Sequence, residues 1–244
     1  MPTAMPMDTM ATATKPALAR LRLLQLVSPS LPIGAFAYSQ GLEWAVEARW
    51  ISDAAAVEAW LADQLHQSVA RVDLPLLRRM QCTAAERDPA ALSAWIDRLL
   101  ALRETAELRA EEANRGRALA DLLATLGLLE PAAGQGAPID WRALLARSQL
   151  AGFGFAAAAW EIDVFDALSG YAWAWLENLA LAAVKIVPLG QSQGQQLLAR
   201  LAASIPAAVD TASGLGDADI GAASPALAIA SSRHETQYTR LYRS

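Results

Sequence analysis

Apolar residues in this chain recur at helical spacing along nearly its whole length. The pattern i, i+3, i+4, i+7, i+8, which marks a helix with one buried face, is followed by Leu92, Trp95, Ile96, Leu99 and Leu100. Asp88 and Pro89 come just before this stretch, as an N-cap and a first-turn proline do. No segment alternates polar and apolar residues as a half-buried strand does. The sequence therefore predicts an all-α fold, a single helical domain of about eight to ten helices.

The composition supports a folded protein and limits what it can bind. The chain has 244 residues, of which 54% are hydrophobic, enough for a substantial core. Its formal charge of -5 argues against nucleic-acid binding, which needs a basic surface to neutralise phosphates. The single cysteine, Cys82, excludes an intrachain disulfide and favours a reducing compartment, so we expect a cytoplasmic protein.

The two ends of the chain differ from its middle. Residues 1–17 lack the basic start and apolar run of a signal peptide, and we expect them to be disordered. The most apolar run, residues 171–187, is short for a membrane span and carries Glu177 and Lys185, so a buried core helix and no membrane contact are expected. Residues 18–224 are then the helical domain, and residues 225–244 a flexible tail that binds partners.

Three local patterns subdivide the helical domain. Gly152 and Gly154 are expected to break a helix, and residues 131–138 are expected to form a loop. The pair Glu111 and Glu112, followed by Arg115, is interpreted as a solvated helix face with modest i,i+4 support.

The segment from Ser28 to Glu43 concentrates rigid and hydroxyl-bearing residues in a chain otherwise rich in alanine and leucine. Pro29 and Pro32 fix their own φ angles and disfavour helix at the residue before each, so a preceding helix should end near Ser28. Gly34 permits a sharp reversal, and a helix is expected again over residues 42–50. We therefore interpret this segment as a shaped surface.

A second loop, from Gly190 to Gly194, matches the G-x-S-x-G nucleophile elbow. Ser192, followed by Asp210 or Asp217 and then His234, even has the order of a hydrolase triad, and a serine hydrolase remains one alternative. The elbow requires a strand before it, and Pro188 interrupts the only short run that could supply one. The local sequence alone favours a loop between two helices whose ends are capped by glutamines.

Tight metal or nucleotide binding by this chain is not expected. Only two histidines, His66 and His234, accompany the one cysteine, too few for an ordinary zinc or nickel site. The Gly190 loop lacks the Gly-Lys-Ser/Thr ending of a P-loop. We expect no tightly bound cofactor.

Three separated motifs resemble those of the UreF family of urease accessory proteins. They are the proline and glycine segment Ser28–Glu43, the element running from Lys185 through Pro188, Gly190 and Gln191 to Gln195, and the C-terminal residues Ser232–Ser244. Their order and spacing also agree, and the resemblance covers about Leu18 to Ser244. Ala35 and Ala37 depart from the family, which often has glycine or serine at these positions.

This resemblance implies a helical chaperone or scaffold, without enzyme activity, that is required to place nickel in apo-urease. It implies that the chain forms a homodimer, bridges UreD (also called UreH) to the GTPase UreG, and couples nucleotide state to nickel delivery, with nickel handled by the complex. A generic helical interaction module is a further alternative. Carried over to the matching positions, the resemblance predicts these partner-binding residues: Pro32, Gly34, Tyr38, Ser39, Gln40, Gly41, Glu43, Lys185, Gly190, Gln191, Gln195, Arg233, His234, Glu235, Gln237, Tyr238 and Arg240.

Overall fold

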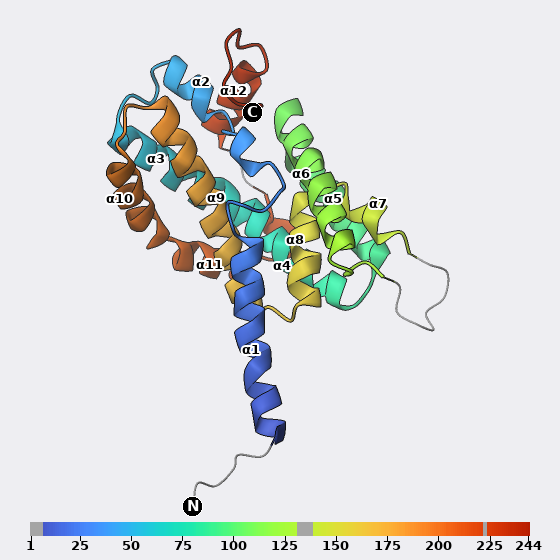
Figure 1. The fold of residues 1–244 in the computed structure, drawn as a ribbon. Coiled ribbons are helices and arrows are strands. Elements are labelled where there is room, and N and C mark those ends of the chain that lie inside the picture. Colours follow the sequence, from blue (N-terminus) through green and yellow to red (C-terminus); the bar gives the residue numbers. More distant parts are fainter. Residues whose placement is uncertain (1–6, 131–138, 222–223) are drawn as a thin grey trace, which may run out of the picture.

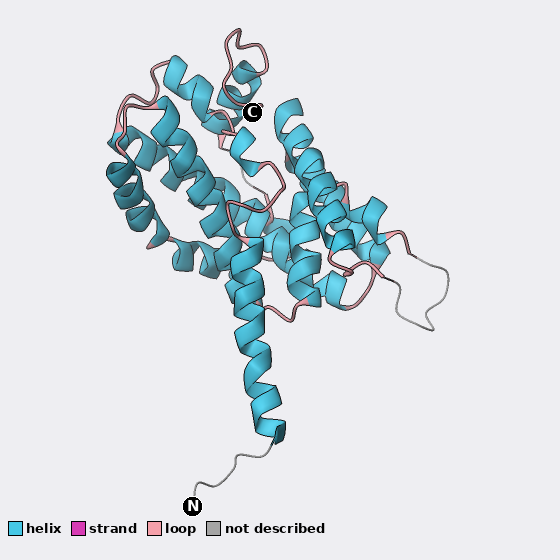
Figure 2. Cartoon of the chain, in the orientation of Figure 1, coloured by secondary structure: helices cyan, strands magenta, loops and turns pink. Residues whose placement is uncertain are grey.

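The computed structural model describes residues 7–130, 139–221 and 224–244, and all regular secondary structure within them is helical (Figure 2). Ten of the α-helices in these residues have ten or more residues, and two are shorter. The predicted all-α class and helix number are confirmed. The loop predicted at residues 131–138 lies outside the described residues.

The α-helices follow one another along the chain, and Figure 1 shows them clustered into one body from which the first projects. They are α1 (Met7–Leu26), α2 (Leu42–Glu47), α3 (Ala54–Gln64), α4 (Leu74–Ala85), α5 (Pro89–Leu102), α6 (Ala106–Thr125), α7 (Trp141–Leu145), α8 (Gln149–Ala159), α9 (Val164–Ile186), α10 (Gln191–Ala202), α11 (Ile205–Gly214) and α12 (Pro225–His234). A π-helical segment, η2 (Leu65–Asp73), joins α3 to α4, and short 3-10 turns are η1 (Ala35–Ala37) and η3 (Asp217–Asp219).

Helix α1 begins well before the helical start predicted at residue 18. Residues 7–17 are helical, which differs from the disorder expected there, and residues 1–6 lie outside the described part. Alanine, common in this stretch, has the highest helix propensity, and Pro16 does not end the helix. At its other end α1 stops at Leu26, next to the prolines, as predicted.

The centre of the fold is α8, which is buried between α4 and α6. The prediction that Gly152 and Gly154 break a helix is wrong, because both lie inside α8. A Cβ at Gly152 would lie 2.9 Å from Cδ2 of Leu119 in α6. These glycines therefore permit close helix packing, which outweighs their low helix propensity.

Helix α9 is the longest in the described residues and packs against α10, α11 and α4. It covers most of the apolar run at residues 171–187, so the expected core helix is confirmed. Within the described residues, no helix combines the length and the apolar character needed to cross a membrane.

The flexible C-terminal tail is a prediction that the structure corrects. Residues 225–234 form α12, which packs against α2 and α6, and Tyr242 and Ser244 beyond it are also buried. Apolar contacts of Leu227 and Ala230, together with polar contacts described below, hold the tail on the body. Sequence analysis missed this because the polar partners lie far away in the chain.

Candidate partner-binding sites

The Ser28–Glu43 segment turns back on itself and meets the end of the chain. Its two reversals are at Gly34 (φ 69°) and Gly41 (φ 78°), both in the left-handed region that favours glycine. A Cβ at Gly41 would lie 2.8 Å from the backbone nitrogen of Ser231 in α12. Gly41 therefore lets α12 approach the backbone of the first motif.

We call the polar contact between the tail and the body the C-terminal seam; it is formed by Ser39, Glu43, Glu107, Glu111, His234, Arg240 and Ser244. Glu43 at the start of α2 accepts the backbone N–H of Leu241 at 2.6 Å and that of Tyr242 at 2.9 Å. Its Oε2 also lies 3.2 Å from Nε2 of His234. One carboxylate thus anchors the chain on both sides of residue 240.

His234 is fully buried between two carboxylates of the seam. Its Nδ1 lies 2.7 Å from Oε2 of Glu107, and its Nε2 lies 3.2 Å from Oε2 of Glu43. Each ring nitrogen of His234 therefore has a carboxylate oxygen as its neighbour. Arg240 donates to the other oxygen of Glu107 at 2.9 Å. Two basic residues of the tail therefore face two acids of α2 and α6.

The inner end of the seam is closed by the last residue. Ser39 donates from its backbone N–H (2.7 Å) and its hydroxyl (2.5 Å) to the main-chain oxygen of Ser244. The Ser244 hydroxyl donates to Oε2 of Glu111 at 3.2 Å. The other oxygen of Glu111 accepts from Arg115 at 2.7 Å and from Gln40 at 3.1 Å. Residues 39 and 40 thus join the end of the chain to α6.

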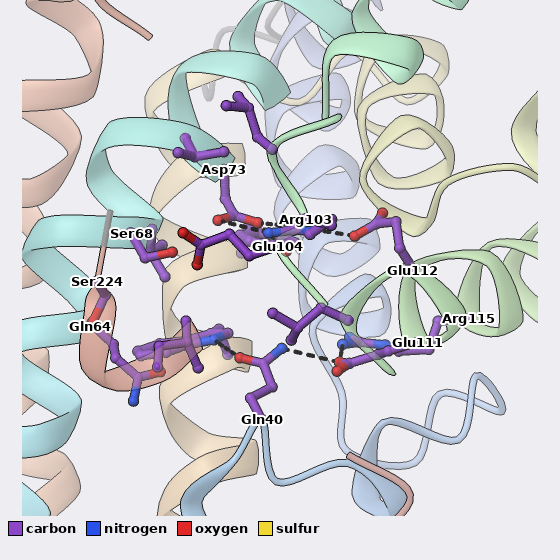
Figure 3. A pocket seen from close by; sticks show the side chains of 17 residues that line it. Gln40, Gln64, Ser68, Asp73, Arg103, Glu104, Glu111, Glu112, Arg115 and Ser224 are labelled. Atoms are coloured by element: carbon purple, nitrogen blue, oxygen red, sulfur yellow. Dashed lines mark hydrogen bonds and ion pairs between the residues drawn. The ribbon is translucent and has the colours of Figure 1, made fainter. Parts of the chain in front are cut away.

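Gln40 is one of the residues that line a small polar cavity of about 40 Å³. Figure 3 shows the side chains around it. The indole N–H of Trp175 in α9 donates to Oε1 of Gln40 at 2.8 Å, so Gln40 bridges α9 and α6. Gln64 also lines the cavity, and neither polar atom of its buried side chain has a partner within the described residues. Ordered water fits a polar space of this size, since one water needs roughly 10–15 Å³.

Arg103 occupies the far end of this cavity and joins two carboxylates (Figure 3). It donates to Asp73 at 2.5 Å and to Glu112 at 2.9 Å. Burial alone would lower the pKa of Arg103, but the charges of Asp73 and Glu112 raise it well above its usual range. Burial would likewise raise the pKa of Glu112, but Arg103 and donors from Leu150 and Ser148 lower it. Both groups therefore stay charged inside the fold.

The expected solvated face of α6 is a second correction. Glu111 and Glu112 are both buried, although the i,i+4 pair of Glu111 with Arg115 does form. Over the part of the chain that the structure describes, no three or more His, Cys, Asp or Glu side chains are arranged to hold a metal ion. The buried acids of the cavity and seam are instead paired with Arg103, Arg115 and His234.

A larger space of about 280 Å³, which we call the apolar groove, lies beside this network. Arg115, Tyr171 and Trp175 line both the groove and the polar cavity. Its apolar lining comes from the end of α1, the first motif, α8, α9 and the tail: Leu26, Val27, Leu31, Ile33, Phe36, Phe153, Leu181, Ala182 and Tyr242. The groove thus brings together all three motifs, because Lys185 also lines it.

Two polar groups at the groove have no partner among the described residues. The hydroxyl of Tyr242 and Nε of Arg115 are buried and unpaired. Burial, with a contribution from the charge of Glu43, raises the pKa of the Tyr242 hydroxyl. Phe36 is 70% exposed and Leu181 is 40% exposed, so part of the apolar surface faces solvent.

Lys185 and the Gly190 loop are on the surface at the junction of α9 and α10. Lys185 is exposed in the last turn of α9. Gly190 is the N-cap of α10, and its N–H donates to Oε1 of Gln193 at 2.9 Å. The local prediction of a loop between helices, capped by a glutamine, is confirmed.

The serine-hydrolase alternative is wrong. Ser192 follows helix α9 and a short loop, not a strand, and it is exposed on the first turn of α10. His234 is buried in the seam, where each ring nitrogen faces a carboxylate. Asp217 pairs with Arg79 at 2.7 Å. The structure therefore assembles no triad around Ser192.

The seventeen predicted partner-binding residues fall into buried, partly buried and exposed groups. Those of the tail and of the first motif meet at the seam. The buried ones are Tyr38, Ser39, Gly41 and His234, the partly buried ones are Gly34, Gln40, Glu43 and Gln237, and the exposed ones are Pro32, Lys185, Gly190, Gln191, Gln195, Arg233, Glu235, Tyr238 and Arg240. Among these, Glu235 accepts the backbone N–H of Ala106 at 2.9 Å, at the start of α6.

Sequence reasoning missed residues that complete the seam and the groove: Glu107, Glu111, Arg115, Trp175 and Tyr242. The acids at 107 and 111 and the arginine at 115 recur at intervals of four, which places them on one face of α6. Two basic residues of the tail, His234 and Arg240, could have suggested acidic partners for the tail.

The comparisons with known proteins agree with the family resemblance. Residues 51–202 match the sequence model of the UreF family. The chain is 50% identical over 226 residues to the urease accessory protein UreF of Alcanivorax borkumensis, covering 91% of this chain and 97% of that protein. It is 51% identical over 227 residues to that of Pseudomonas putida strain GB-1 (93% and 98%), and 47% identical over 225 residues to that of Escherichia coli O157:H7 (92% and 97%).

Proposed function

Because the chain belongs to the UreF family of urease accessory proteins, we propose that it is the bridging scaffold of the complex that loads nickel into apo-urease. Family membership makes it a non-catalytic chaperone for maturation of the urease nickel metallocentre, acting within the accessory complex. The proposal adds that it forms a homodimer in the cytoplasm, joins UreD (UreH) to the GTPase UreG, and couples nucleotide state to nickel delivery.

One observation carries this proposal: residues from all three sequence motifs line a single groove. Phe36 belongs to the first motif, Lys185 to the second and Tyr242 to the third. A groove that is partly apolar, with a few polar groups, is the usual form of a binding site. We propose that UreG docks on the side of the molecule that carries Lys185 and the N-terminus of α10.

The outer face of the tail is the part that we assign to UreD. Tyr238 is fully exposed and Leu241 is 65% exposed, while His234, Tyr242 and Ser244 hold the tail from beneath. Exposed aromatic and aliphatic side chains on a fixed backbone suit a protein interface, because little entropy is lost when they are buried. Arg233 and Glu235 are also exposed and add charge to this face.

Nickel is proposed to be cargo of the assembled complex, without tight binding to this chain alone. The chain has two histidines and one cysteine, and His234 is already engaged with Glu43 and Glu107. Titration of the isolated chain with nickel should show no saturable site of submicromolar affinity. A saturable site in the monomeric chain would contradict this.

The experiment that tests the proposal is reconstitution from purified UreD, UreG and this chain. We expect UreD and UreG to co-elute only when the chain is present, and the amount of UreG retained to depend on the guanine nucleotide supplied. The readout of function is nickel content and activity of apo-urease after incubation. Equal association of UreD with UreG in the absence of the chain would refute the bridging role.

A further inference from the structure

Two buried polar groups that line the apolar groove have no partner among the described residues. One is the hydroxyl of Tyr242, a residue that is only 6% exposed. Nε of Arg115 is likewise buried and unpaired, and Lys185 lines the same space. Leaving a buried polar group unpaired costs free energy, so a ligand that supplies an acceptor would be favoured.

We propose that the apolar groove binds a segment of a partner protein in which a bulky apolar side chain stands next to a carboxylate. The apolar side chain would pack between Phe36 and Leu181, and the carboxylate would accept hydrogen bonds from Tyr242, Arg115 or Lys185. This inference rests on the proposed function, in which the Lys185 side of the molecule faces a partner.

The charged and polar groups around the groove favour an acidic occupant over a basic one. Glu177 is the acidic side chain of its lining; burial raises its pKa, and the Trp173 side chain partly offsets this rise. Asn178 donates to the carbonyl of Tyr38 at 3.2 Å. Glu43 and Glu111, which lie behind Tyr242 and Arg115, are engaged in the seam. Tyr242, Arg115 and Lys185 are therefore the groups of the groove that can donate to an acidic occupant.

The size of the groove favours one or two side chains of a protein over a whole cofactor. Its volume of about 280 Å³ is at the lower limit of small-molecule pockets, which span about 300–1,000 Å³. Its rim is continuous with exposed side chains, since Phe36 and Leu181 both reach solvent. A protein segment can insert a side chain while its backbone stays outside.

The decisive variants are a matched pair of leucines. Leu181 in the groove is 40% exposed and Leu126, beyond the end of α6, is 39% exposed. In binding measurements with purified UreD and UreG, Leu181→Asp should weaken association by about tenfold or more, as loss of an interface anchor does. Leu126→Asp should leave it within about twofold. Tyr242→Phe, which removes only the hydroxyl, should weaken it about threefold to tenfold. Thermal melts of each variant establish that the fold is retained.

A pair of dyes tests the chemistry of the groove without any partner. The anionic dye 8-anilinonaphthalene-1-sulfonate should bind better than N-phenyl-1-naphthylamine, which lacks the sulfonate. Lys185→Gln and Tyr242→Phe should reduce the preference for the anionic dye, and Leu181→Asp should weaken the binding of both dyes. Equal binding of the two dyes to the unmodified chain would overturn the assignment of an acidic occupant.

The remaining outcomes separate this inference from the proposed function. If the unmodified chain binds neither UreD nor UreG, the proposed function fails, and the dye pair still decides the chemistry of the groove. If it binds them and Leu181→Asp binds equally well, the inference fails and the scaffold role stands. If Leu181→Asp instead turns a dimer into a monomer with partner binding intact, a second copy occupies the groove and the inference is wrong.

Discussion

The C-terminal seam and the apolar groove meet at Tyr242 and differ in how their buried polar groups are paired. Tyr242 gives its backbone N–H to Glu43 in the seam and its ring to the groove. In the seam, both nitrogens of His234 and both oxygens of Glu43 have partners. In the groove, buried donors have none among the described residues. Satisfied polar contacts indicate a surface used for folding, and unsatisfied donors beside exposed apolar side chains indicate one used for binding.

The comparison predicts that loss of Glu43 has the largest effect on stability. Glu43→Ala leaves the N–H groups of Leu241 and Tyr242 without their acceptor and Nε2 of His234 without its partner, at a cost of about 3–5 kcal/mol. Chemical denaturation of the variant should show this drop in the free energy of unfolding. Glu47→Ala is the control, since Glu47 lies on the same helix, is exposed and contacts only Gln237 in the tail. Similar stability of both variants would mean that the seam does not stabilise the fold.

The next largest effect is expected in how the stability contributed by Glu112 depends on pH. Because its pKa is lowered in the folded protein, Glu112 stabilises the fold above its ordinary value of 4.5, and this contribution is lost as the pH falls through the lowered value. Glu112→Gln should cost about 2 kcal/mol at pH 7 and progressively less in acid.

Unfolding in urea at a series of pH values from 7 to 3 measures this dependence. Glu58→Gln is the control, because Glu58 pairs with Arg200 on the surface, where ion pairs contribute little. Parallel curves for Glu112→Gln and the unmodified chain would contradict the account of the buried Arg103 cluster.

A smaller effect on stability, with a large effect on binding, is expected at the exposed part of the tail. The double variant Tyr238→Ala, Leu241→Ala should change the free energy of unfolding by no more than about 0.5 kcal/mol, because both side chains face solvent. It should nevertheless lose retention of UreD in a pull-down. If the double variant retains as much UreD as the unmodified chain does, the outer face of the tail is not the UreD-binding surface.

The smallest effect is expected at Ser192. Ser192→Ala should alter neither stability nor partner binding, because the side chain is exposed on the first turn of α10 and has no role in the seam or the groove. Neither protein should react with a fluorophosphonate probe. If the probe labels the unmodified chain and does not label the variant, the serine-hydrolase hypothesis would be supported again.

The sequence predicted helices well because helical periodicity and caps are local. Asp88 caps α5 and the prolines after Leu26 end α1, both as expected. The errors at Gly152 and Gly154 arose because a glycine inside a helix lowers its propensity locally, while its benefit depends on a neighbour such as Leu119. Tertiary packing therefore keeps α8 continuous through both glycines.

The sites were predictable only as separate motifs. Family resemblance identified Glu43, Lys185 and His234, but nothing local indicated that Glu43 and His234 are in contact across 191 positions. The buried acids of α6 were misjudged for the same reason, because their partners Arg103, Gln40 and Ser244 come from three different parts of the chain. Spacing fixes which face a residue occupies, and the partner on that face comes from the fold.

Hydrogen exchange of the backbone amides, measured for the free chain and for its complex with UreD and UreG, tests the division between seam and groove most directly. We expect the amides of Leu241 and Tyr242 to be protected already in the free chain, and residues 28–36 and 174–185 around the groove to gain protection on binding. Rapid exchange at Leu241 and Tyr242 in the free chain, with protection appearing only in the complex, would contradict it.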